Sequence, residues 1–308
     1  MGLLNYVARR VLFTIPLLIV ISIFVFSLIH LAPGDPVSLL VNPRLGEEAR
    51  EQKRKELGLD KPLPIQYLQF MKDLITGRLG KSYYAEKKIS AMLAARLPNT
   101  LALTGLGLAF SYVIAIPAGV VAALNRGKFL DYASMSVALI GLAMPQFWLG
   151  LILMLVFSVH FDLLPVAGVG SFQHLILPSI TLGAYGAALT ARITRSSMLE
   201  VLHKDYIRTA RAKGLRERIV CYKHALRNAL IPIISLLGMR IGWLVGGAVM
   251  VEVVFTRPGI GRLMVNSIHR RDYLVVQIII LMLAISVILG NLLADILNSL
   301  TDPQIRYN

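Results

Sequence analysis

Three ionisable side chains lie within long apolar runs of the sequence, at Arg240, Glu252 and Asp295. A charge inside a hydrocarbon layer is costly, so such residues usually face a water-filled cavity or pair with another charge. Arg240 lies so deep in its run that its side chain would reach water only with strain. We therefore expect Arg240 and Glu252 to line a pathway or to form pairs at an interface between subunits. Glu252 and Asp295 lie near opposite ends of the last two runs and cannot pair with each other.

Four histidines, His30, His160, His174 and His269, raise the question of a metal site, because imidazole binds nickel and similar ions well. No carboxylate or thiol stands at ligand spacing from them, and Cys221 is the only cysteine. Scattered histidines of this kind are more often interfacial than ligands. We expect no metal site and no intrachain disulfide. A chelated metal carried as cargo is not excluded.

The sequence has none of the common motifs of hydrolytic chemistry. It contains no G-x-x-x-x-G-K-[ST] phosphate loop, no H-E-x-x-H and no G-x-S-x-G. We therefore expect no catalytic and no cofactor-binding residues, and no enzyme activity. If ATP drives a process in which this chain takes part, another chain must bind and hydrolyse it.

Composition indicates where these residues reside. The chain has 308 residues, 56% of them hydrophobic and 16% charged, and its mean hydropathy is +0.67. Such values are typical of a membrane protein. The net charge of +15 could indicate nucleic acid, but basic residues of membrane proteins gather in cytoplasmic loops and near anionic lipid. We expect membrane lipid, and not nucleic acid, as their partner.

Six apolar windows are long enough to cross a bilayer, which takes about 20 residues of helix. They are residues 11–31, 100–124, 132–160, 175–191, 230–254 and 274–297. The first exceeds the apolar run of a typical signal peptide, so it is expected to be a retained anchor. The sequence predicts an all-α polytopic membrane protein with six transmembrane helices.

A sizeable insertion, residues 33–99, separates the first two windows. It opens with the breaker cluster Ala-Pro-Gly-Asp-Pro and continues with a charged helical stretch at about 46–57. A second helix is expected to begin at Pro64, and its apolar stripe should pack on the membrane domain. The stripe consists of Ile65, Leu68, Met71, Leu74 and Ile75. The organisation is thus 1–32 as first end and anchor, 33–99 as an extracytoplasmic helical insertion, and 100–308 as the transmembrane core.

Between the fourth and fifth windows, residues 192–229 form a loop with ten Lys and Arg against three acidic residues. One helix is expected around 198–206, a second from Tyr206 to Lys213 that Gly214 ends, and a third at 219–229. Helix, glycine and helix make a protruding elbow. The alternative is a positive loop that only fixes topology. Basic residues in the short segments place this loop and both termini in the cytoplasm.

Several motifs in order along the chain carry a family resemblance. They are HLAPGDP, LGLDKPLPIQY, LPNTLAL, FWLG, DYIRTARAKGL, HALRNALIP, FTRPGIGRL and RDYLVVQ. With Ala210 and Gly214 in the elbow, the chain resembles permeases of binding-protein-dependent ABC importers, in the version found in dipeptide, oligopeptide and nickel systems. The Glu-Ala of the general EAA loop is Arg208-Thr209 here, which departs from the general motif.

The resemblance implies an inner-membrane importer subunit of a prokaryote that forms half of a pathway for dipeptides or oligopeptides. Its partners would be a second homologous permease, two cytoplasmic ATP-binding subunits that hold ATP and Mg, and an extracytoplasmic substrate-binding protein. The elbow would be the element coupled to the ATPases. The residues implied in this coupling are Tyr206, Arg208, Thr209, Ala210, Arg211, Ala212, Lys213, Gly214 and Leu215.

Other functions remain open at this stage. The cargo could be a nickel chelate or a glutathione-like molecule, since the binding protein would hold most of the selectivity. An ion-coupled secondary transporter would usually show paired repeats and midplane carboxylates, and none is evident. A scaffold could use the basic loop for docking alone. The helix-glycine-helix elbow favours the importer subunit, because only that class requires an element that receives force.

Overall fold

The chain is described by a computed structural model that covers residues 3–31, 37, 46–56 and 58–301. Over these residues it is helical, and the only β-type pairing is an isolated bridge between Lys81 and Lys88. The helices are α1 (Leu3–Leu31), α3 (Gly46–Glu56), α4 (Leu63–Ile75), α5 (Ile89–Ala94), α6 (Leu97–Leu124), α7 (Phe129–Ala143), α8 (Gln146–Met154), η2 (Leu155–His160), α9 (Gln173–Leu202), α10 (Asp205–Ala212), α11 (Glu217–Ile219), η3 (Val220–Ala225), α12 (Leu226–Ala229), α13 (Ile231–Val254), α14 (Ile260–His269) and α15 (Tyr273–Thr301). The all-α prediction is confirmed.

Long apolar helices coincide with the predicted windows. Among the described residues, the segments Ile89–Leu124, Gln173–Leu202 and Tyr273–Ile296 are each long and apolar enough to cross a membrane. The pair α7 and α8–η2 qualifies together, and shorter apolar helices lie at Leu12–Ser27 and Ile231–Arg240. Each window therefore holds an apolar helix, and the count of six spans stays a prediction.

The third window differs from the prediction of one continuous span. Helices α7 and α8 meet at 109° across Met144 and Pro145. Proline has no amide hydrogen and disfavours helical geometry in the residue before it, and Met144 accordingly has an extended backbone with φ −75° and ψ 128°. The break therefore has a local cause in the sequence.

Small residues hold α6 and α9 close together. A methyl group at Gly183 would lie 2.5 Å from the carbonyl oxygen of Gly107, and one at Gly119 would lie 2.5 Å from Cβ of Thr194. Such contacts let helix backbones approach closely in lipid. Helix α9 has 30 residues, so it continues well beyond the predicted window into the predicted loop. The first predicted loop helix is thus the end of this long helix.

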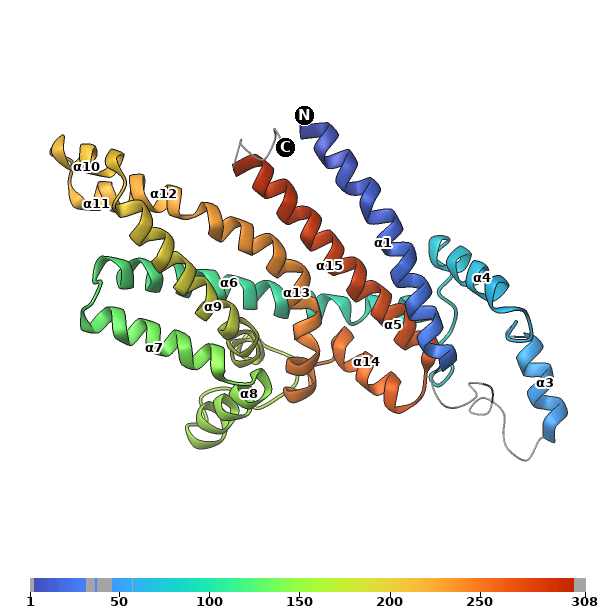
Figure 1. The fold of residues 1–308 in the computed structure, drawn as a ribbon. Helices are drawn as coiled ribbons and strands as arrows, with labels where there is room; N and C mark the ends of the chain where they lie inside the picture. Colours follow the sequence, from blue (N-terminus) through green and yellow to red (C-terminus); the bar gives the residue numbers. More distant parts are fainter. Residues whose placement is uncertain (1–2, 32–36, 38–45, 57, 302–308) are drawn as a thin grey trace.

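A second close pair is formed by α13 and α15, where a methyl group at Gly238 would lie 2.3 Å from Cα of Ala294. Helix α1 lies along the other side of α15 (Figure 1), and an ion pair of 3.0 Å joins Arg10 to Asp295. This pair explains how Asp295 is accommodated near the end of an apolar helix. The start of α1 and the end of α15 lie on the side of the bundle from which α10 projects (Figure 1).

In the insertion, α3 and α4 have the predicted positions, and α4 contacts α1 through side chains that lie beside the predicted apolar stripe. Phe26 of α1 contacts Tyr67 and Phe70 of α4, with ring centroids 5.6 Å and 6.0 Å apart. Ser22 shares a hydrogen bond of 2.8 Å with the Tyr67 hydroxyl. Within the predicted stripe, Ile65, Leu68 and Ile75 are 48% to 79% exposed, whereas Met71 and Leu74 are half-buried. Aromatic side chains beside the stripe make the contact.

Candidate functional site

The elbow consists of α10 and its connections to α9 and to α11. Helix α10 ends at Ala212, and Gly214 follows with φ +72°, a left-handed conformation that favours glycine. The Gly214 amide donates to the Arg211 carbonyl at 2.9 Å, and the Leu215 amide donates to the Ala210 carbonyl at 3.4 Å. These two bonds are the pattern of a Schellman C-cap. The predicted second helix and its glycine stop are confirmed.

Two buried side chains fix α10 to the bundle. Ile207 is 0% exposed and Ala210 is 8% exposed, three residues apart and so on one face of the helix. They belong to a core that joins α6, α9, α10, η3 and α12. Its buried members are Val120, Ala123, Met198, Val201, Ile207, Ala210, Val220, Ala225 and Ala229. Ile207 was absent from the predicted coupling residues, although its spacing from Ala210 signals an anchor.

The remaining predicted elbow residues face outward. Tyr206 is 44% and Leu215 38% exposed, and the side chain of Arg208 is 78% exposed. Other exposed members are Thr209, Arg211, Ala212, Lys213 and Gly214. Ala210 differs from the others because its methyl group is buried in the core that holds α10 to the bundle. The elbow thus presents a basic, exposed face on a short apolar base.

Side-chain contacts stiffen the turn after α10. Arg211 forms an ion pair with Glu217 across Gly214, with Nη2 and Oε1 2.7 Å apart. The hydrogen bond from Arg211, with its charge, holds the pKa of the Glu217 carboxyl below its usual value. Asn228 of α12 donates to the Tyr206 hydroxyl at 2.8 Å. Both ends of α10 are therefore tied to the returning helices.

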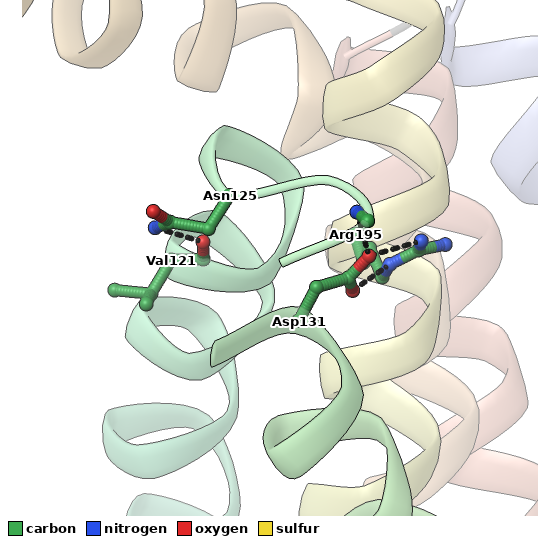
Figure 2. A network of polar contacts seen from close by, with 5 residues as sticks. Val121, Asn125, Asp131 and Arg195 are labelled. Atoms are coloured by element: carbon green, nitrogen blue, oxygen red, sulfur yellow. Dashed lines mark hydrogen bonds and ion pairs between the residues drawn. The ribbon is translucent and has the colours of Figure 1, made fainter. Parts of the chain in front are cut away.

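An ion pair with a buried carboxylate lies between the elbow and the membrane core. Figure 2 shows Asp131 at the start of α7 facing Arg195 of α9, with contacts of 2.5 Å to Nε and 2.7 Å to Nη2. Asp131 is 2% exposed and also accepts a bond from the Gly127 amide at 3.0 Å. The bidentate pairing compensates for taking the Asp131 carboxylate out of water, while the Arg195 side chain stays 27% exposed. The pair connects the α6–α7 turn to α9 seven residues before α9 ends.

At the opposite end of α6, Glu252 accepts only neutral donors. It is 0% exposed, and its oxygens accept from the Thr100 hydroxyl at 2.5 Å and the Arg262 amide at 3.1 Å. Thr100 in turn accepts from the Ile260 amide at 2.9 Å. A methyl group at Gly259 would lie 1.9 Å from Oε1 of Glu252. The carboxylate therefore fills the turn between α13 and α14.

Arg240 lies in the tenth position of α13 and is 8% exposed. Its guanidinium stands over the ring of Tyr185, 4.9 Å from the centroid. No described residue gives it an ion pair or a hydrogen bond. It lines a cavity of about 110 Å³ between α13, α9 and the α7–α8 break. The lining residues are Gly141, Met144, Gln146, Leu149, Thr181, Leu182, Ala184, Tyr185, Arg240 and Gly247.

No group of three or more metal-binding side chains occurs among the described residues. His174 accepts a bond from the Ser171 amide at 3.2 Å and contacts its hydroxyl at 3.0 Å, and it lies at the start of α9.

Comparison with known proteins assigns the family. Residues 115–307 match the family described as "Binding-protein-dependent transport system inner membrane component", and residues 3–104 match its N-terminal part. The chain belongs to this family of importer permeases. The glutathione transport system permease proteins GsiC of Escherichia coli and Pectobacterium atrosepticum are each 43% identical over 305 residues, which covers 99% of this chain and 100% of theirs.

Solved transporters share the fold of this permease. The inward-facing MetNI methionine ABC transporter matches with a TM-score of 0.57 at 21% identity, over 69% of this chain and 97% of that chain. An amino acid ABC transporter solved with histidines matches with a TM-score of 0.54 at 15% identity, over 68% and 94%. The family match and the 43% identical relatives make this chain a multi-pass inner-membrane subunit of an ABC importer, a class that works with ATPases and a substrate-binding protein.

The structure separates the predicted site residues into distinct places. The elbow residues share one projecting element, Arg240 lines a cavity within the helix bundle, and Glu252 fills the turn between α13 and α14. The Asp131–Arg195 pair was not predicted, because its members are 64 residues apart and stand at the edges of separate windows. The contact that defines it exists only once α7 packs beside α9.

Proposed function

We propose that this permease forms half of a translocation pathway for small peptides and is coupled to cytoplasmic ATPases through α10. The observation that carries the proposal is that α10 stands outside the bundle on Ile207 and Ala210 while its other residues are exposed. We propose two ATP-binding subunits, a second homologous permease and an extracytoplasmic binding protein as partners. ATP and Mg would be bound by the ATPases, and this chain would have no enzyme activity.

The coupling role follows from how α10 is held. A short helix that fits a groove on an ATPase can move as a rigid body when the ATPase closes. Here the Schellman cap, the Arg211–Glu217 pair and the Asn228–Tyr206 bond resist bending of the elbow itself. Motion of α10 would therefore pass to α9 on one side and to α13 on the other. The exposed basic side chains suit an acidic rim on the ATPase.

A peptide cargo is supported by the relatives. The two relatives are named as glutathione transport permeases and align over their whole length. Glutathione is itself a small peptide, so it belongs to the proposed class of cargo. A nickel chelate stays the alternative cargo. The described residues hold no cluster of metal-binding side chains, and this finding does not discriminate between a peptide and a metal that travels in complexed form.

The proposed orientation places both termini and the elbow in the cytoplasm and residues 33–99 outside. It is supported by the common side of the bundle on which α1 begins, α15 ends and α10 projects (Figure 1). Ten basic residues between 192 and 229 agree with the excess of Lys and Arg in short cytoplasmic segments. The same orientation puts Glu252 and α14 near the outer surface.

The test is affinity purification of the tagged chain in mild detergent, with identification of co-purifying subunits and an ATPase assay. We expect ATP-binding subunits and a second permease to co-purify. Reconstituted with the binding protein, the complex should import glutathione or a dipeptide only with ATP. Purification of the chain without other subunits and without ATPase activity would contradict the proposal. Import of a nickel chelate in place of peptides would replace the proposed peptide cargo by the alternative.

A further inference from the structure

We infer that Arg240 binds a carboxylate of the cargo during translocation, at the cavity where the α7–α8 break faces α9 and α13. The inference rests on the proposed import of peptides and deepens it. Peptides carry a terminal carboxylate, and a guanidinium binds a carboxylate with two parallel hydrogen bonds.

The first support is the state of Arg240 itself. It is 8% exposed, and by helix geometry it lies about 14 Å along α13 from the start of that helix. Among the described residues, no acceptor forms a hydrogen bond with its five N–H donors. The face of the Tyr185 ring stabilises the positive charge of the guanidinium only in part. A buried guanidinium with free donors is costly unless an anion or water completes it. Asp131 and Glu252 already have donors of their own, so neither supplies the missing anion.

A second positive element faces the same cavity. Helix α8 begins at Gln146, which lines the cavity together with Leu149. The first amide hydrogens of a helix have no acceptor within the helix, and its N-terminus carries partial positive charge. The Gln146 side chain is directed to the Leu182 carbonyl on α9, with Nε2 donating at 3.4 Å. A broken helix whose N-terminus faces a central site is how several transporters hold anionic groups.

Space at the cavity comes from glycine and sets the size of the ligand. A methyl group at Gly186 would lie 3.2 Å from Nη1 of Arg240, so a glycine there lets the guanidinium take its position. Gly141 and Gly247 line the cavity as well. A volume of about 110 Å³ is well below the roughly 300 Å³ at which whole-ligand pockets begin. The cavity therefore takes one carboxylate-bearing end, and the rest of the peptide extends past the exposed edge of Tyr185.

Charge at the cavity can be tested without knowing the cargo. Ala184→Cys places a thiol on the lining in a Cys221→Ser background, in the assembled complex. Modification rates are compared for sulfonatoethyl and trimethylammonioethyl methanethiosulfonate, an anion and a cation of similar size. We expect the anion to react about tenfold faster, and Arg240→Gln to remove most of this preference. Tyr222→Cys places the thiol at an exposed position in the elbow region and is the control. There, Arg240→Gln must not change the ratio of the anionic to the cationic modification rate.

Recognition is tested by transport in proteoliposomes with the binding protein. Uptake of a labelled dipeptide is compared with its C-terminal amide, each normalised to its affinity for the isolated binding protein. We expect Arg240→Gln to lower dipeptide uptake about tenfold and to bring the ratio of dipeptide uptake to amide uptake near one. Arg240→Lys should give values between those of the native permease and Arg240→Gln. Arg192→Gln removes the same charged group from an exposed position outside the cavity lining, so it should leave the ratio of dipeptide uptake to amide uptake unchanged.

The outcomes separate the inference from the proposed function. Loss of the second permease on purification of Arg240→Gln would show that Arg240 pairs across subunits and would overturn the inference. Equal losses for dipeptide and amide, or an anion preference that survives Arg240→Gln, would also overturn it. If the intact complex imports no peptide, the proposed cargo fails, while the thiol measurement still decides whether Arg240 makes the cavity selective for anions.

Discussion

The carboxylates of Asp131 and Glu252 are both nearly inaccessible, but they are satisfied by different donors at opposite ends of α6. Asp131, beside the elbow, meets the full charge of Arg195 in bidentate geometry. Glu252, at the turn between α13 and α14, accepts from the Thr100 hydroxyl and a backbone amide. A charge pair depends on two side chains and tolerates motion of either helix as long as both move together. A carboxylate held by backbone and hydroxyl groups fixes one local turn.

The largest effect is expected for Asp131→Asn. It keeps the size of the side chain but places an amide group against the Arg195 guanidinium, so this partly exposed charge loses its ion-pair partner. We expect the permease to lose about 2 kcal/mol of stability, measured as a lower unfolding midpoint in mild detergent. Arg192→Gln, an exposed site on the same helix, is the matched control and should change the midpoint little. An unchanged midpoint in Asp131→Asn would remove the pair as a stabilising element.

The next effect concerns the elbow. Gly214→Val forces a β-branched side chain into a left-handed backbone, at a cost of about 1 to 2 kcal/mol, although no atom lies within 4 Å of its Cβ position. We expect ATP hydrolysis to continue while uptake falls and the protein stays in the membrane. Gly214→Asn, which tolerates this conformation better, should retain most uptake. Normal uptake by Gly214→Val would argue against α10 as the coupling element.

A smaller effect is expected for Glu252→Gln. The amide oxygen can still accept one bond, and no guanidinium loses a direct salt bridge. We expect a loss of about 1 kcal/mol, and the same unfolding assay would measure it. Thr100→Ser, which keeps the bridging hydroxyl between Glu252 and the Ile260 amide, should cost less than Thr100→Val. If Glu252→Gln proves costlier than Asp131→Asn, the contrast between the two carboxylates is wrong.

The smallest effect follows from pH at the elbow. Because Arg211 lowers the pKa of Glu217, the pair stabilises the folded elbow above the pKa of about 4.3 that an unfolded Glu has. The stabilisation is lost as pH falls through the lowered folded value. Both side chains are substantially exposed, so the contribution should stay below about 1 kcal/mol. Proteolysis of the elbow by an acid-active protease should increase below about pH 4 in the native permease and change less with pH in Glu217→Gln.

Sequence patterns predicted the features that depend on local order along the chain. The apolar windows, the α10 helix and the Gly214 stop follow from spacing within a few residues, and the structure agrees with them. Pro145 also offered a local signal for the α7–α8 break, which the length of the apolar run concealed. Hydropathy does not register a bend.

Other features depend on contacts between distant segments. The Asp131–Arg195 pair and the Thr100–Glu252 bond join residues 64 and 152 positions apart. The face by which α4 packs is set by Phe26 of α1, and the stripe of α4 alone could not reveal it. The cavity at Arg240 requires four segments to meet. Composition placed an arginine in an apolar run, but only packing shows that the described residues leave it without an acceptor.

The length of α9 has a mechanical consequence if the Asp131–Arg195 contact serves as a pivot. From Arg195, the helix extends about 10 Å to its end at Leu202 and about 15 Å in the other direction to Tyr185. The two segments on either side of this pivot differ in length, so a displacement at the end of the shorter segment is about half as large again at the end of the longer one. A displacement of a few ångströms at the elbow would then shift the wall of the Arg240 cavity by more than the elbow itself moves, in the opposite sense.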